Sequence, residues 1–97
     1  MNPFFEAQGK LWAEAAARRG ARIDPPAMDS DIALELLELA RVAAHTRERR
    51  FAPLSCYLAG VAAERLRAAQ PDADDSAIAT LIEEVRKQLE VDETLSS

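Results

Sequence analysis

The residues that could bind an anion are concentrated in one short stretch near the middle of the chain. Arg41 and His45 are one helical turn apart, and Arg49 follows four residues later. Pro53 suits the first position of a new helix, where the free backbone N–H groups of residues such as Ser55 could also donate. Arginines beside a helix N-terminus commonly bind phosphate or carboxylate. The sequence therefore predicts a ligand- or partner-binding corner made of Arg41, His45, Arg49, Pro53 and Ser55.

The same cations also have an ordinary structural explanation. Glu38 is spaced to pair with Arg41, and Glu48 can pair with a neighbouring arginine. Cations near the end of a helix also interact favourably with its dipole. Because exposed charges are usually solvated, the residues alone leave both interpretations open.

No residue pattern predicts a reaction or a bound cofactor. With one cysteine and one histidine, the chain can form neither an internal disulfide nor a zinc site made from these residues. It also lacks a glycine-rich phosphate loop, an H-E-x-x-H motif, a C-x-x-C motif and a nucleophile elbow. Cys56 is typical of a small packing residue, and no third group that would orient a Cys56–His45 pair is evident. We therefore expect a non-enzymatic protein without catalytic residues, metal or cofactor.

Length and charge narrow the range of partners. The 97 residues suit a single domain, and 17 acidic against 12 basic residues give a formal net charge of −5. This charge disfavours nucleic acid. The sequence shows no signal peptide and no apolar run of membrane-spanning length. We therefore expect a protein partner or an anionic ligand, neither nucleic acid nor membrane, and a location in the cytoplasm.

Four segments carry the signals of helices, and the scarcity of aromatic residues leaves little for a sheet. Asn2 and Pro3 predict the start of the first helix, and Pro25 and Pro26 predict an extended linker over 21–29. The predicted helices span about 3–19, 29–46 and 53–70, with a fourth that follows Asp75 and frays beyond about residue 91. The expected fold is a small antiparallel four-helix bundle. A three-helix core with the first helix laid across it is the alternative arrangement.

Apolar residues at helical spacing predict the core. The expected core positions are Leu36, Leu39, Leu58, Val61, Ile82 and Val85, with Trp12 covering one end. Cys56, Gly60 and Ala63 form a stripe of small residues on the far side of the third helix. Such a stripe allows another helix to approach closely.

The middle of the chain also resembles a known family. The motifs on which the resemblance rests are LARVAAH at 39–45, E-R at 48–49, A-P-L at 52–54 and L-x-G at 58–60. They are similar to an uncharacterised bacterial family of small helical domains that occur alone or C-terminal to proteins resembling molybdenum-cofactor guanylyltransferases. The resemblance implies a link to molybdenum-cofactor or formate-dehydrogenase biology and no known activity. It singles out Arg41, His45 and Arg49, whereas Arg50 stands where the family tends to have proline.

Together these features predict a non-enzymatic helical accessory or binding module. It would dock a partner protein or an anionic ligand at the corner between the second and third helices. The alternative is a structural or dimerisation subunit that uses the small-residue stripe of the third helix. A helix-turn-helix that binds DNA is a weaker reading, because the third helix lacks the polar side chains of a recognition helix.

Overall fold

Four helices make up the described part of the chain. The computed structural model describes the backbone of residues 2–96 and the side chains of residues 2–91. The helices are α1 (Pro3–Arg18), α2 (Ser30–Thr46), α3 (Phe51–Ala69) and α4 (Asp75–Ser96), and no strand occurs among the described residues. The prediction of an all-α, bundle-like fold is confirmed. The predicted fraying beyond about residue 91 concerns residues whose side chains lie outside this description, so it stays a prediction.

Side chains cap the first two helices, and Asn2 lies at the predicted start of the first. The Asn2 side chain accepts a hydrogen bond from the Phe4 amide at 2.8 Å. The Asp29 carboxylate likewise accepts from the amides of Asp31 and Ile32, both at 3.0 Å. These bonds satisfy amides that have no partner in the first turn of a helix. Gly20 ends the first helical region with a φ of 82°, a left-handed conformation that glycine adopts without strain.

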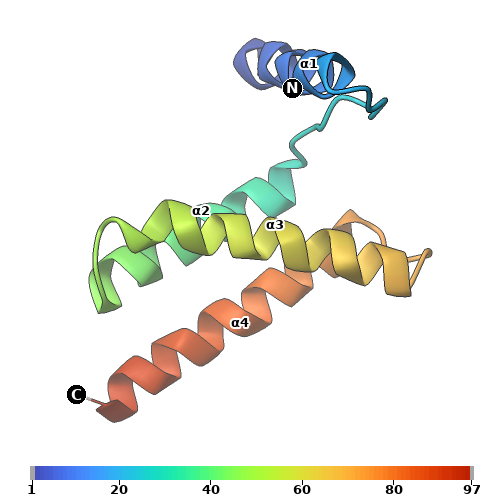
Figure 1. The fold of residues 1–97 in the computed structure, drawn as a ribbon. Helices are drawn as coiled ribbons and strands as arrows, with labels where there is room; N and C mark the ends of the chain where they lie inside the picture. The colour runs from blue at the N-terminus through green and yellow to red at the C-terminus, as the bar shows by residue number, and fades with distance from the viewer. Residues whose placement is uncertain (1, 97) are drawn as a thin grey trace.

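The central helix of the core is α2. It packs against both α3 and α4, whereas α3 and α4 touch each other only over a short stretch and diverge toward the C-terminal end of α4 (Figure 1). The buried cluster between the three helices consists of Leu39, Ala63, Ile78 and Ile82, with Ile32, Leu36, Ala59 and Leu66 packed around it. This divergence leaves a wedge-shaped space on one side of the core.

Helix α1 stands apart from the other three helices (Figure 1). No Cα atom of α1 comes within 8 Å of a Cα atom of α2, α3 or α4. Instead, the buried Gly9 lies directly on the linker, where any Cβ at this position would collide with the carbonyl oxygen of Pro26. The core is therefore built from three helices. Trp12 is 58% exposed, so the prediction that it covers one end of the core is wrong.

The side of α3 that faces the core differs from the predicted one. Ala59 and Ala63 pack in the core, whereas Leu58 is 67% exposed and Val61 is half-buried. Small side chains let α3 approach α2 closely, and the Cys56 thiol lies 3.7 Å from the Leu36 carbonyl oxygen. The predicted burial of Leu58 is therefore wrong. That prediction rested on the size of the side chain, whereas the close approach of the α2 and α3 backbones favours small residues at their contact.

Most of the core positions predicted on α2 and α4 are buried or half-buried. Leu39 and Ile82 are buried, as predicted, and Leu36 is half-buried against them. Val85, however, is 52% exposed, because it borders the space where α4 diverges from α3. Leu58 and Val85, both exposed, border the same space between α3 and α4.

Candidate functional site

The predicted anion corner does not have the free amides that were expected. Helix α3 begins at Phe51, two residues before Pro53. The Phe51 and Ala52 amides donate to the carbonyl oxygens of Glu48 and Arg49, at 2.9 and 3.2 Å. Pro53 has no N–H, and the amides after it lie inside the helix, where each donates four residues back. The expectation that Pro53 opens the helix and leaves donors free at residues such as Ser55 is therefore wrong.

Arg41 is engaged by two carboxylates. Its Nε donates to Glu38 at 2.7 Å, as the spacing predicted, and its Nη2 lies 3.7 Å from the carboxylate of Glu90 on α4. Glu90 also pairs with Arg86 at 3.1 Å, and Arg86 reaches across to Glu35 of α2 at 3.1 Å. Arg41 thus belongs to a charge network that ties α2 to α4.

This network predicts the titration of one carboxyl group. The hydrogen bond from Arg41, followed by the charge of Arg41, holds the pKa of Glu38 below its usual value. A depressed pKa means that the pair stabilises the fold above the unfolded pKa, and that this contribution is lost as the pH falls through the folded pKa. NMR titration of the Glu38 carboxyl carbon is expected to show the lowered pKa. The variant Arg41→Met is expected to return it toward the ordinary value, and an unchanged pKa would contradict the pairing.

His45 and Arg49 remain available at the corner. Both are exposed, and neither side chain makes a hydrogen bond or ion pair within the part of the chain that the structure describes. Arg50, by contrast, pairs with Glu48, as predicted for a neighbouring arginine. Of the predicted residues, Arg41 is thus paired with carboxylates, whereas the His45 and Arg49 side chains are unpaired within the described part of the chain. Anion binding by His45 and Arg49 stays a prediction.

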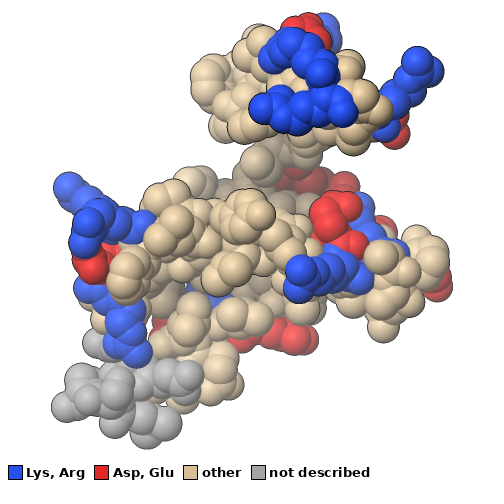
Figure 2. Space-filling model, in the orientation of Figure 1, with Lys and Arg blue, Asp and Glu red and all other residues tan. Residues whose placement is uncertain are grey.

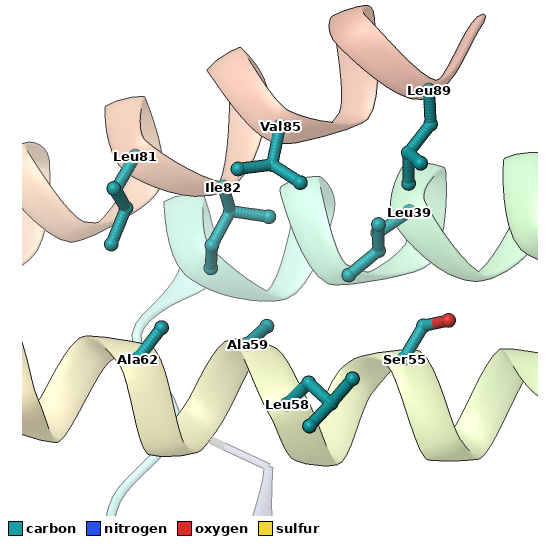
Figure 3. Close-up of a pocket in the computed structure, with 9 residues that line it drawn as sticks. All are labelled: Leu39, Ser55, Leu58, Ala59, Ala62, Leu81, Ile82, Val85 and Leu89. Atoms are coloured by element: carbon teal, nitrogen blue, oxygen red, sulfur yellow. The ribbon is translucent and has the colours of Figure 1, made fainter. Parts of the chain in front are cut away.

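An apolar groove lies between α3 and α4 (Figure 3). Ile82, Val85 and Leu89 project from α4 toward α3, and Leu39 of α2 closes the bottom. The groove has a volume of about 380 Å³. Its complete lining, which defines the α3/α4 groove, is Leu39, Ser55, Leu58, Ala59, Ala62, Leu81, Ile82, Val85 and Leu89. Ser55, predicted as part of the corner, lines one end of this groove.

A second apolar hollow separates α1 from the outer side of α3. Its volume is about 810 Å³, and the residues of this α1/α3 cleft are Trp12, Pro26, Tyr57, Gly60, Val61, Glu64, Arg65 and Ala68. Gly60 faces open space, since a Cβ there would meet no atom within 4 Å. The face of the molecule in Figure 2 is uncharged over the middle of α3, with Lys and Arg gathered toward its ends. Two neighbouring stripes of α3 therefore border two apolar hollows.

The structure offers little support for a reactive thiol. Burial raises the pKa of Cys56, which favours the protonated thiol over the nucleophilic thiolate.

Among the described residues, no three metal-ligating side chains are grouped so that they could hold an ion. None of the helices in that part of the chain combines the length and hydropathy needed to cross a bilayer.

Comparison with known proteins identifies the family. A family model described as a domain of unknown function, DUF6457, matches residues 6–95. The chain belongs to this family. No curated protein and no solved structure matches it significantly. Membership confirms the predicted resemblance to an uncharacterised small domain, and the match extends well beyond the central motifs to all four helices of this DUF6457 protein.

Sequence reasoning missed both hollows of this DUF6457 domain. Leu54, Tyr57 and Leu58 are all more than 60% exposed. A signal was present, since α3 carries apolar residues on more than one side and only one side can face a core. That excess of apolar positions could have predicted an additional binding surface on α3.

Proposed function

We propose that this protein is a non-enzymatic helical docking module that binds a partner protein through the α3/α4 groove. The observation that carries the proposal is the groove itself: leucine, isoleucine and valine side chains from three helices line a hollow left open to solvent. Exposed apolar surface of this kind is costly to leave in water and typically marks an interaction site. The scarcity of polar groups in the lining favours docking over chemistry, which needs placed polar groups.

The occupant that best fits the groove is an amphipathic helix of the partner. The lining runs from Ser55 to Ala62 along α3 and from Leu81 to Leu89 along α4, which is about 12 Å or two helical turns. Two turns accommodate apolar anchors at positions i, i+4 and i+7 of a bound helix. Because the chain has a net charge of −5, a helix with lysine or arginine on its polar face would be attracted.

The basic corner would supply a polar contact beside this groove. Ser55 lines the end of the groove that lies nearest to His45 and Arg49 in sequence. A carboxylate of the partner, or a separate anionic ligand, would pair with these two cations. Arg41 and Pro53 would act indirectly, the first by holding α2 to α4 and the second by shaping the start of α3. The family resemblance suggests a cytoplasmic partner from molybdenum-cofactor or formate-dehydrogenase biology, such as a guanylyltransferase-like protein.

Val85→Glu tests the groove directly. Val85 is 52% exposed, so glutamate at this position is expected to leave the fold intact while placing a charge in the apolar groove. Fluorescence anisotropy with a labelled helical peptide, carrying leucines at i, i+4 and i+7 and lysines elsewhere, measures the effect. The variant is expected to bind at least about 10-fold more weakly than the wild type, equivalent to about 1.4 kcal/mol.

Leu37→Glu is the matched control for this experiment. Leu37 lies on α2, is 68% exposed and does not line the groove, so its variant should bind the peptide as the wild type does. Equal affinities of the Val85→Glu and wild-type proteins would overturn the proposal. The same two variants can be compared with candidate molybdenum-pathway proteins in place of the peptide.

A structural or dimerisation role is the second candidate. The small-residue stripe does not support it as a unit, because Ala63 is buried in the core and Cys56 contacts α2. Only Gly60 of the three is exposed. Its position in the α1/α3 cleft favours an association surface that differs from the predicted stripe.

A further inference from the structure

The chain exposes more surface than a compact monomer of its size. Its accessible surface is 7375 Å², against about 5,500 Å² expected for a folded monomer of this mass. Its radius of gyration is 15.0 Å, against about 12.5 Å expected for a compact domain of this length. The excess of about 1,900 Å² is comparable to what one subunit contributes to a large obligate interface.

Large apolar side chains are exposed on α1 and on the outer side of α3. On α1, Phe4, Leu11 and Trp12 are 63%, 62% and 58% exposed, because no other helix packs against them. On α3, Tyr57 is 71% exposed. Trp12 and Tyr57 stand on opposite walls of the α1/α3 cleft. The cleft thus has apolar side chains on both walls, and no side chain of the described residues occupies the space between them.

We infer that a second copy of this chain fills the cleft, with α1 of each copy lying in the α1/α3 cleft of the other. A two-fold axis between the two α1 helices would give the order α3, partner α1, α1, partner α3. Each α1 would then contact the partner's α1 on one side and the partner's α3 on the other. A two-fold interface requires a surface complementary to itself, and α1 is both a wall of the cleft and the element that fills it.

The charges of these elements favour a second copy over a membrane surface. The cleft carries one acidic and one basic residue, Glu64 and Arg65, so two copies can meet there without a concentration of like charge. The polar side of α1 alternates in sign through Glu6, Lys10 and Glu14. A helix that lies on an anionic bilayer is instead rich in basic residues on its polar face.

This dimer is independent of partner docking in the α3/α4 groove. The two hollows use different stripes of α3, with Leu58 and Ala62 on the groove side and Tyr57 and Val61 on the cleft side. Association can be measured on the purified protein alone. Loss of peptide binding and loss of dimerisation are therefore separate results.

Sedimentation equilibrium and the fluorescence of Trp12, the only tryptophan, test the inference. The wild type is expected to be a dimer at micromolar concentration, and dilution should shift the emission of Trp12 to longer wavelength as the cleft opens. Tyr57→Glu places a charge in the cleft and is expected to raise the dissociation constant at least about 30-fold, the effect of losing an interface hot spot. Its circular dichroism should stay helical, since the side chain is exposed in the single chain.

Leu37→Glu again provides the control, because its side chain is similarly exposed but lies outside the cleft. This variant is expected to dimerise as the wild type does, and its dissociation into monomers would overturn the proposed interface. A wild type that stays monomeric at about 100 μM would also overturn it, since that concentration exceeds the dissociation constants of obligate dimers. If Trp12 then shifted only after addition of lipid vesicles or another protein, the cleft would belong to that occupant.

Discussion

Replacing Ile78 with alanine is expected to lower the free energy of unfolding by about 2–5 kcal/mol, the range measured for buried isoleucine and leucine. Ile78 is 1% exposed and belongs to the small cluster in which α2, α3 and α4 meet. Because a domain of this size is stabilised by only about 5–15 kcal/mol, the loss would be a large fraction of the total.

Urea denaturation followed by circular dichroism measures this loss. The matched control is Val85→Ala on the same helix, where the residue is 52% exposed and alanine brings a similar gain in helix propensity. The control is expected to change the free energy of unfolding by less than about 1 kcal/mol. Similar values for the two variants would show that Ile78 does not pack in the core of the folded protein.

The second large effect is expected for Arg86→Met, which should cost about 1–3 kcal/mol. The Arg86 side chain is 14% exposed and bonds Glu35 of α2 and Glu90 of α4, both at 3.1 Å. Methionine keeps most of the length of the side chain but leaves the Glu35 carboxylate, itself only 20% exposed, without this cation. The cost arises mainly from that unpaired, partly buried charge.

Lys87→Met is the control for this charge network. Lys87 is the next residue, 64% exposed, and pairs only loosely with Glu83 at 3.8 Å. Its substitution is expected to change stability by less than about 0.5 kcal/mol. Adding Glu35→Gln to Arg86→Met should restore part of the lost stability, since the unpaired charge is removed. An Arg86→Met variant as stable as Lys87→Met would show that the network contributes nothing.

The helices themselves could be predicted because their signals are local. Asn2 and Asp29 act through hydrogen bonds to amides two or three residues away, and Gly20 acts through its own backbone conformation. The pairs Glu38–Arg41 and Arg86–Glu90 were likewise predictable from spacing along one helix. The Arg86–Glu35 pair, by contrast, joins residues 51 positions apart, and only the packing of α4 on α2 brings them together.

The orientation of α3 could not be predicted from periodicity alone. Apolar residues occur on several sides of this helix, so the largest ones, including Leu58, suggested the core face. The structure instead buries Ala63 and half-buries Ala59, because α3 lies close enough to its neighbours to exclude larger side chains. Because the small residues of α3 face the core, its larger apolar side chains line the groove and the cleft. The error in the orientation of α3 therefore hid both hollows. The free amides expected at the corner were also predicted wrongly. Helix α3 starts at Phe51 and not at Pro53, because the preceding turn supplies carbonyl oxygens that accept from the Phe51 and Ala52 amides.

The position of Gly9 on Pro26 has a consequence for the entropy of association. A helix joined by a flexible linker would lose much of its orientational freedom on binding, and that loss would weaken the complex. Here Pro25 and Pro26 restrict the linker backbone, and the missing side chain at position 9 lets α1 lie on it without a gap. The orientation of α1 is thus already restricted in the single chain. A side chain at position 9 would release that restraint, and association would weaken although no residue of the interface had changed.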